Sequence, residues 1–262
     1  MLRVDGISKT FFAGTVNEKL ALNNVSLEMR PGDFITVIGG NGAGKSTLMN
    51  SIAGVFKIDR GKIYIDDVDV TDMPEHERAA YIGRVFQDPM LGTASGMMVE
   101  ENLAMAARRG QKLQLRWGFR DDEFAEFKEK LAKLDLGLED RLKSRMGTLS
   151  GGQRQAITLL MATLRKPKLL LLDEHTAALD PKTAEKVLAL TRRVVEENGL
   201  TTLMITHNMR DALRFGNRLL MLNDGEILLD IQGGEKAKTT IHDLLDAFEH
   251  SGKEVSDRMA LG

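Results

Sequence analysis

The 262-residue chain contains no cysteine, which excludes disulfide bonds, thiolate metal sites and a cysteine nucleophile. It also lacks an excess of charge of either sign, because 36 Lys and Arg residues are balanced by 38 Asp and Glu residues, for a formal net charge of −2. Proteins dedicated to nucleic acids usually carry a basic excess. The balance therefore argues against that class, and we expect no nucleic-acid partner.

Long apolar runs are missing as well. No stretch approaches the roughly 18 consecutive apolar residues of a membrane-spanning helix, and residues 1–6 show no apolar signal-peptide core. We therefore expect a soluble chain that reaches any membrane through a partner. Hydrophobic residues still make up 42% of the chain, which is enough for the core of one large domain or two small ones.

What the chain does contain is dominated by one glycine-rich stretch. An apolar run at residues 34–38, typical of a buried strand, precedes it, and a helical run at residues 48–53 follows it. Strand, glycine loop, Lys-Ser and helix in this order form the phosphate-binding loop of nucleotide-binding proteins. Its residues are Gly39, Gly40, Asn41, Gly42, Ala43, Gly44, Lys45, Ser46 and Thr47.

This stretch suits phosphate for physical reasons. Glycines let backbone N–H groups turn toward an anion, and the positive end of the new helix faces the same place. The motif predicts that Lys45 reaches the β- and γ-phosphates of a nucleotide and that the Ser46 hydroxyl binds Mg²⁺. An ordinary glycine turn is a poor alternative, since it explains neither the Lys-Ser pair nor the flanks. The motif alone does not separate a kinase, a GTPase, a motor and a transporter.

Gln87, Asp173 and His207 each come directly after an apolar run typical of a strand. The carboxyl ends of parallel strands meet at one edge of a sheet, where open α/β folds bind ligands, so His207 is expected near the phosphates. Asp173 could hold Mg²⁺ through water there, and the adjacent Glu174 could polarise an attacking water as a general base. The plainer alternatives are a solvated glutamine, helix-capping acids and a structural histidine.

Three further features stand out. Residues 8–14 form an expected loop whose aromatic side chains, Phe11 and Phe12, could stack on a base or fill the core, and the loop by itself favours the core. Asp180, just before a proline, stands in the position of a helix cap. A second anion-type helix start is predicted by the run Leu149-Ser150-Gly151-Gly152-Gln153.

The remaining sequence is typical of an α/β protein, with an all-helical insertion expected where no strand-like run occurs, between about residues 99 and 166. The expected strands are residues 2–7, 25–29, 34–38, 61–65, 82–86, 168–172, 201–206, 217–222 and 226–231, the last two as a hairpin. The expected helices are residues 75–80, 100–109, 122–134, 152–164 and 181–197, and one whose apolar face comprises Ile241, Leu244, Leu245 and Phe248, before a loose tail at residues 251–262.

The middle of the helical insertion is basic. A solvated loop face is the favoured interpretation, and contact with a membrane protein or anionic lipid headgroups is the alternative. The side chains concerned are Arg108, Arg109, Lys112, Arg116 and Arg120, with Trp117 and Phe119 between them.

Taken in order, these motifs resemble the ATP-binding subunit of an ABC transporter over roughly residues 2–231. The Leu-Ser-Gly-Gly-Gln run is the most specific part, because chance would give it in well under about one chain in a thousand. The resemblance implies that residues 39–47 are the Walker A loop and that Gln87 senses Mg²⁺ and the γ-phosphate and links to the transmembrane partner. It implies that Asp173 is the Walker B aspartate, Glu174 the catalytic glutamate and His207 the switch histidine.

The resemblance also implies that residues 150–153 bind the γ-phosphate held by the opposite subunit and that Asp180 belongs to the D-loop. Phe11 stands where the family's adenine-stacking aromatic stands, which reverses the preference for a core role. One departure is His175, where the residue after the catalytic glutamate is often proline.

The implied fold is an α/β P-loop core with a mostly parallel sheet, an N-terminal antiparallel β subdomain and an inserted all-helical subdomain at about residues 88–166. One ATPase domain is expected over residues 1–240, with a C-terminal helix and tail at 241–262. The implied ligands are ATP and Mg²⁺. Two chains would pair head to tail around ATP, each site taking its P-loop from one chain and its Ser150 loop from the other.

The resemblance implies an ATPase that energises a separate permease for solute uptake, with an extracytoplasmic solute-binding protein in the same system, at the cytoplasmic side of the membrane. The turn around residues 173–180 and residues 93–95 resemble a branch associated with amino-acid-type cargo. Two alternatives stay open. One is an ABC system for lipoprotein release or mechanotransmission, and the other is a soluble ABC ATPase outside transport, which usually carries a coiled-coil insertion or two cassettes.

Overall fold

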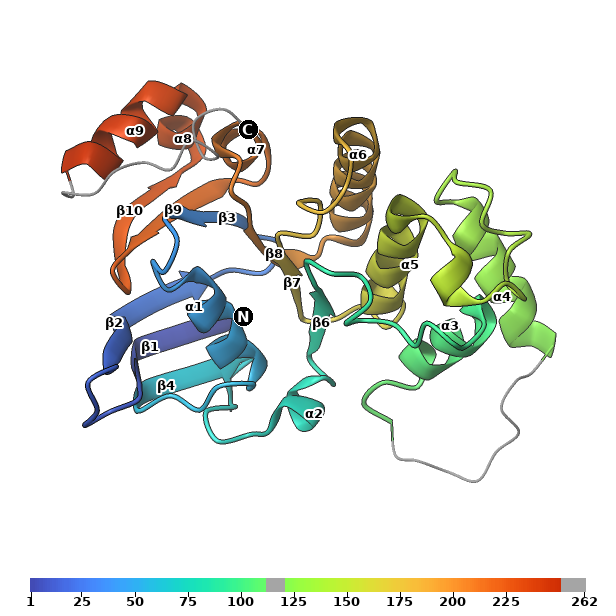
Figure 1. Ribbon diagram of the computed structural model, residues 1–262, viewed down its shortest axis with the longest axis horizontal. Coiled ribbons are helices and arrows are strands. Elements are labelled where there is room, and N and C mark those ends of the chain that lie inside the picture. Colours follow the sequence, from blue (N-terminus) through green and yellow to red (C-terminus); the bar gives the residue numbers. More distant parts are fainter. Residues whose placement is uncertain (112–120, 251–262) are drawn as a thin grey trace. The chain divides into compact units, whose positions relative to one another are not determined.

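The computed structural model describes residues 1–111 and 121–250, which fall into two compact units. The first unit contains Met1–Arg78 and the C-terminal part of the chain from Gly199, and the second contains Ala79–Asn198. Figure 1 shows the elements of each unit in sequence colours. In the part of the chain that the structure describes, no helix is both long and apolar enough to cross a bilayer.

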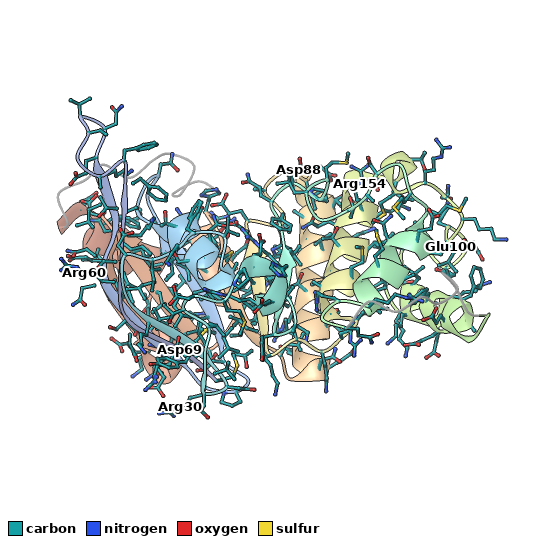
Figure 2. All side chains as sticks on the ribbon, turned by 90° about the horizontal axis from the view of Figure 1, so that it is seen from below. Arg30, Arg60, Asp69, Asp88, Glu100 and Arg154 are labelled. Carbon is teal, nitrogen blue, oxygen red and sulfur yellow. The ribbon has the colours of Figure 1, made fainter. Side chains whose placement is uncertain are left out.

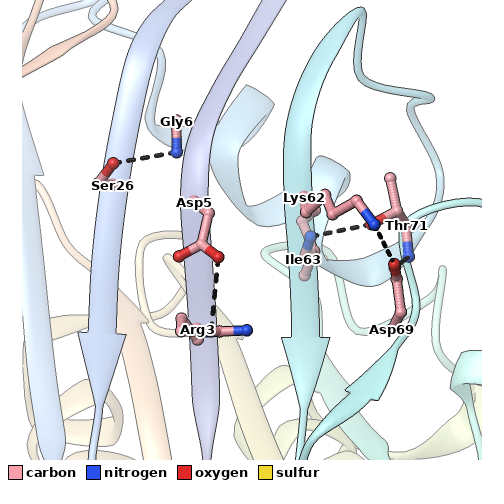
Figure 3. Close-up of polar contacts among 8 residues, drawn as sticks. All are labelled: Arg3, Asp5, Gly6, Ser26, Lys62, Ile63, Asp69 and Thr71. Carbon is pink, nitrogen blue, oxygen red and sulfur yellow. Dashed lines mark hydrogen bonds and ion pairs between the residues drawn. The ribbon is translucent and has the colours of Figure 1, made fainter.

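An antiparallel sheet in the first unit has the strand order β2-β1-β4-β5. Its strands alternate apolar and polar residues, so that Leu2 and Val4 are buried while Arg3 is exposed. Polar contacts tie neighbouring segments of this sheet together, including the 3.0 Å bond from the Lys62 ammonium to Asp69 (Figure 3). The strands are β1 (Leu2–Phe11), β2 (Lys19–Met29), β4 (Arg60–Ile65) and β5 (Val68–Asp69).

The other strands of the first unit follow the order β10-β9-β3-β8. Strands β8 and β9 run parallel to β3, and β10 returns antiparallel to β9. Every residue of β3 is buried, including Thr36, as its nearly continuous apolar run predicts. The elements are β3 (Phe34–Gly39), β8 (Thr201–Ile205), β9 (Arg218–Asn223), β10 (Glu226–Gln232), α1 (Lys45–Ala53), α2 (Glu75–Arg78), α7 (Met209–Arg214), α8 (Gly233–Lys238) and α9 (Ile241–His250).

In the second unit, β6 runs parallel to β7, and helices make up most of the remainder. Gly83 of β6 lies so close to α5 that a Cβ there would sit 2.4 Å from the Ala162 carbonyl oxygen, so only glycine permits this packing. The elements are β6 (Ile82–Val85), β7 (Leu169–Asp173), α3 (Val99–Ala107), α4 (Asp121–Ala132), the short 3₁₀ turn η1 (Met146–Thr148), α5 (Gly151–Thr163) and α6 (Pro181–Asn198).

Most expected elements are present, and the differences have local causes. The expected loop at residues 8–14 is wrong for its first half, because Lys9 and Phe11 pair with Leu22 and Lys19 and extend β1. The polar Ser-Lys-Thr run obscured a strand that its pairing partner stabilises. Strand β5 and the short helices α7 and α8 were not expected. In the apolar face of α9, Leu244 and Phe248 are buried as predicted.

The basic segment is only partly described, since Lys112, Arg116, Trp117, Phe119 and Arg120 lie outside the described residues, as does the expected tail at 251–262. The solvated interpretation is wrong for the two arginines that are described. Arg108 pairs with Glu123 at 3.0 Å, and Arg109 donates to the Ala162 carbonyl oxygen at 2.9 Å. Both side chains are half-buried, and burial lowers the pKa of Arg109.

Candidate functional site

The phosphate-binding loop leaves the end of β3 and enters α1. Gly44, the residue before the helix, adopts a left-handed conformation with φ of 103°, and no side chain caps the first turn. Gly39 passes so close to β9 that a Cβ there would lie 2.4 Å from the Leu222 carbonyl oxygen. The backbone path that the sequence predicts for phosphate therefore requires glycine at both positions.

Lys45 folds back over this loop. Its Nζ donates to the carbonyl oxygens of Gly39 at 2.7 Å and Gly40 at 3.1 Å, and the residue is 6% exposed. A buried ammonium held by loop carbonyls is a preorganised partner for a phosphate oxygen.

A pocket of about 190 Å³ opens over the loop. Phe11 lines it with a half-buried side chain, and its ring packs edge-on against that of Phe56, with 5.2 Å between the ring centroids. Adenine stacking by Phe11 stays a prediction. The lining residues are Phe11, Lys19, Ala21, Gly42, Ala43, Gly44, Lys45, Ser46 and Thr47.

Lys19 is a pocket residue that the sequence did not reveal. It comes from β2, and its Nζ lies where a Cβ on Gly42 would meet it at 2.9 Å. The pocket therefore has a second cation beside Lys45. Only the pairing of β1 with β2, which sets Lys19 opposite Phe11, brings this residue to the phosphate loop.

His207 belongs to the same unit. The ladder between β3 and β8 pairs Val37 with Ile205, and the Thr206 N–H donates to the Val37 carbonyl oxygen at 3.1 Å, so His207 leaves the sheet at the edge where β3 enters the phosphate loop. The side chain of Asn208 then caps α7. This placement agrees with the expectation for His207 and leaves its contact with phosphate a prediction.

In the second unit, Gln87 and Asp173 leave neighbouring parallel strands at the same edge, because Val85 pairs with Leu172. Asp173 Oδ2 lies 3.5 Å from the guanidinium of Arg84, and both side chains are largely buried. Arg84 was missed because its partner is far away in sequence. Glu174 has φ of 45°, a strained value for a residue with a Cβ.

The residues expected to bind Mg²⁺ supply a hydroxyl, an amide and a single carboxylate, from Ser46, Gln87 and Asp173. Oxygen donors of this kind fit Mg²⁺, which keeps several water ligands. Within residues 1–111 and 121–250, no group of three or more His, Asp or Glu side chains could hold a metal ion. Magnesium binding by these residues stays a prediction.

Ser150 and Gln153 cap the N-terminus of α5. Ser150 Oγ accepts from the Gln153 N–H, and Gln153 Oε1 accepts from the Ser150 N–H, both at 3.2 Å. Arg154, which is labelled in Figure 2, supports the turn. Its guanidinium donates to the carbonyl oxygens of Gly147 and Leu149, each at 3.1 Å. The loop is thus a capping box with an exposed Ser150.

Asp180 caps α6, as the sequence predicts. Its Oδ1 accepts from the Thr183 N–H at 3.1 Å, and the hydrogen bonds from Thr183 lower the pKa of this carboxyl. Gly152 lies against the same helix, because a Cβ there would meet the Thr183 methyl at 2.2 Å. The cap therefore fixes Asp180 beside the Ser150 loop, and a role for Asp180 toward nucleotide stays a prediction.

The chain is similar to ATP-binding proteins of ABC transporters. The family model described as "ABC transporter" matches residues 22–177. The chain is 42% identical over 251 residues to a "Tyrosine transport ATP-binding protein" of Clostridioides difficile, covering 96% of this chain and 100% of that one. It is 36% identical over 229 residues to a "Methionine import ATP-binding protein" of Corynebacterium efficiens, covering 85% of this chain and 60% of that one.

The fold is also similar to that of a solved ATP-binding cassette. The dimeric ATP-binding cassette MJ0796 of Methanocaldococcus jannaschii, bound to ADP and Pi in a post-hydrolysis state, superposes with a TM-score of 0.76 at 30% identity, covering 88% of this chain and 98% of that one. The expected fold class, a P-loop core with a mostly parallel sheet, an antiparallel sheet and helices, is confirmed by this likeness.

Proposed function

Because the chain belongs to the ABC transporter family and is an ATPase subunit of a transport system, we propose that it powers the import of an amino-acid-type solute, with tyrosine the first candidate. The proposed cargo is supported by the 42% identity to a tyrosine transport protein over that protein's whole length. A methionine importer among the relatives points to the same chemical class.

The nucleotide site follows from the residues described above. We assign ATP to the pocket over the phosphate loop, with Lys45 and the loop N–H groups on the phosphates and Phe11 against the adenine. Ser46, Gln87 and Asp173 would hold Mg²⁺, which neutralises phosphate charge when bound. Glu174 would take the proton of the attacking water, and His207 would contact the γ-phosphate.

The chain acts with a second cassette and with membrane permease subunits, as dimeric cassettes and transport proteins among its relatives support. We propose that the two chains pair head to tail, so that Ser150, Gly151, Gly152, Gln153 and Asp180 of one chain complete the ATP site of the other. An extracytoplasmic binding protein would deliver the solute, and the cassette would lie on the cytoplasmic face of the membrane, bound through the permease.

The test is uptake in cells that lack this chain, complemented with the wild type or with Glu174→Gln. We expect labelled tyrosine uptake to return only with the wild type, because Glu174→Gln keeps the side-chain shape and removes the base, at a cost of about 10²–10⁴ in turnover. Labelled spermidine serves as the control cargo. Normal tyrosine and methionine uptake in the deletion strain, together with a defect in lipoprotein release, would replace import by the alternative function.

The purified protein gives a complementary test of the site. Glu174→Gln should still bind ATP while hydrolysing it very slowly, whereas Asp173→Asn should weaken the retention of Mg²⁺. Wild-type turnover by Glu174→Gln would remove Glu174 from its proposed role.

A further inference from the structure

His175 follows Glu174 directly and departs from the family pattern. Its side chain is 2% exposed and leaves the turn after β7 toward α6, where its Nε2 lies 3.0 Å from Thr191 Oγ1. A buried polar atom is costly unless it is hydrogen-bonded, so this contact gives Nε2 a partner and joins the turn to the helix.

The direction of this hydrogen bond follows from proton count. The Thr191 hydroxyl has one proton, which it donates to the Val187 carbonyl oxygen at 2.8 Å one turn earlier in α6. Its oxygen must therefore accept from His175, so Nε2 carries the ring proton and the bond is a donation from His175 to Thr191. Burial lowers the pKa of His175 to about 4, in agreement with a neutral ring.

The residue before this ring is under strain. Glu174 has φ of 45°, and a residue with a Cβ keeps such a conformation only when its surroundings determine it. Two contacts do so here. The Glu174 carbonyl oxygen accepts from the Ala177 N–H at 2.9 Å, and the next side chain in sequence is fixed on Thr191 of α6.

We propose that His175 is a positioning residue for Glu174, because its hydrogen bond to Thr191 holds the strained turn that aims the Glu174 carboxylate. The proposal rests on Glu174 as the base of ATP hydrolysis. It predicts an effect on turnover and none on ATP binding, because neither His175 nor Thr191 belongs to the pocket around the phosphate loop.

The test compares Thr191→Val, which removes the acceptor with little change of shape, with Thr191→Ser, which keeps it. We expect Thr191→Val to lower kcat about 10-fold to 100-fold with KM for ATP within about twofold, since a small misplacement of a catalytic group has effects of this size. Thr191→Ser should retain kcat within about threefold. His175→Phe, which fills the site without a donor, should match Thr191→Val.

A double variant separates this proposal from the role of Glu174. In a Glu174→Gln background, Thr191→Val should cause no further loss of kcat, because it acts through the missing carboxylate. The positioning role is overturned if Thr191→Val lowers Tm while leaving kcat of the folded protein unchanged, or if it costs the same factor in the Glu174→Gln background. Wild-type turnover by Glu174→Gln alone would instead overturn the base that the proposal assumes.

Discussion

The helices α1 and α5 both begin beside glycines, and their first turns are completed in different ways. At α1, no side chain caps the helix, and Gly44 in a left-handed conformation opens the loop. At α5, Ser150 and Gln153 satisfy each other's backbone N–H groups. Unsatisfied N–H groups at a helix start attract an anion, whereas a capping box already supplies a partner.

This difference predicts different roles for the loops that precede α1 and α5. Because Lys45 lies over the α1 loop and lines the pocket beside it, we expect this loop to bind phosphate within a single chain. The α5 loop supplies its own acceptors for the Ser150 and Gln153 N–H groups and presents an exposed Ser150. We therefore expect the first loop to set ATP affinity and the second to act only when another chain brings a nucleotide to it.

Lys45→Ala should have the largest effect on this contrast. Removing the ammonium should reduce ATP affinity or turnover about 10²–10³-fold, as loss of one preorganised phosphate contact does. Lys19→Ala, which removes the more exposed cation of the same pocket, should cost about tenfold or less. Calorimetric ATP titration and steady-state ATP hydrolysis of the three proteins measure these losses. Equal losses for Lys45→Ala and Lys19→Ala would mean that burial does not distinguish the two cations.

Lys236 of α8, whose Nζ lies 3.5 Å from Thr36 Oγ1 of β3, provides a pH test. Lys236 is 5% exposed, donates to carbonyl oxygens of Phe215 and Gly216, and has its pKa lowered to about 8 by burial. Since the unfolded value is 10.5, the unfolded state binds more protons between about pH 8 and pH 10. Stability should therefore rise with pH in that window.

Urea unfolding of the wild type and of Lys236→Met across this window isolates the effect. The wild type should gain roughly 1–3 kcal/mol relative to the variant as pH rises, because its hydrogen bonds and nearby solvent reduce the full effect. If the difference in unfolding free energy between the wild type and Lys236→Met stays constant with pH, burial does not destabilise the Lys236 ammonium.

Phe11→Ala tests whether the Phe11 ring, which lines the pocket at the phosphate loop, stacks on the adenine of ATP. We expect ATP binding to weaken by roughly 1–3 kcal/mol, the size of a base-aromatic stack, with a nearly unchanged unfolding midpoint. Phe12→Ala is the matched control, because this neighbour is 69% exposed and does not line the pocket. A loss of several kcal/mol of stability with intact affinity would identify Phe11 as a core residue.

Ser150→Ala should have the smallest effect, because it removes only the cap of α5. Loss of an N-cap costs about 0.5–2 kcal/mol of unfolding free energy. ATP affinity of the single chain should not change, and Ser150→Asn should restore stability. Weaker ATP binding by the monomer would place Ser150 in the site of its own chain.

Sequence reasoning succeeded where the determinants are local. The phosphate loop, the strand that precedes it and the Asp180 cap depend on a few adjacent residues, and all three are found where expected. It failed for Lys19 and Arg84, whose partners lie far along the chain. The two glycine loops were both interpreted as anion-type helix starts, although Ser150 and Gln153 have the Ser-x-x-Gln spacing of a capping box, a sequence signal that separates the second loop from the first.

The proposal that two chains share each ATP site is tested most directly by mixing Lys45→Ala with Ser150→Arg. Both variants carry Glu174→Gln, which keeps bound ATP from turning over. In a mixed dimer, one site combines both lesions and the other combines an intact phosphate loop with an intact Ser150 loop.

About half of the dimers should be mixed when equal pools pair at random. Retained ATP here means ATP that is occluded in a dimer and does not exchange with free nucleotide. We predict that the mixture retains close to one such molecule per mixed dimer. Each variant alone should retain almost none, although Ser150→Arg still binds exchangeable ATP at its intact phosphate loop. If both variants fold and pair, and the mixture retains no more ATP than either variant alone, the ATP site is not shared between chains.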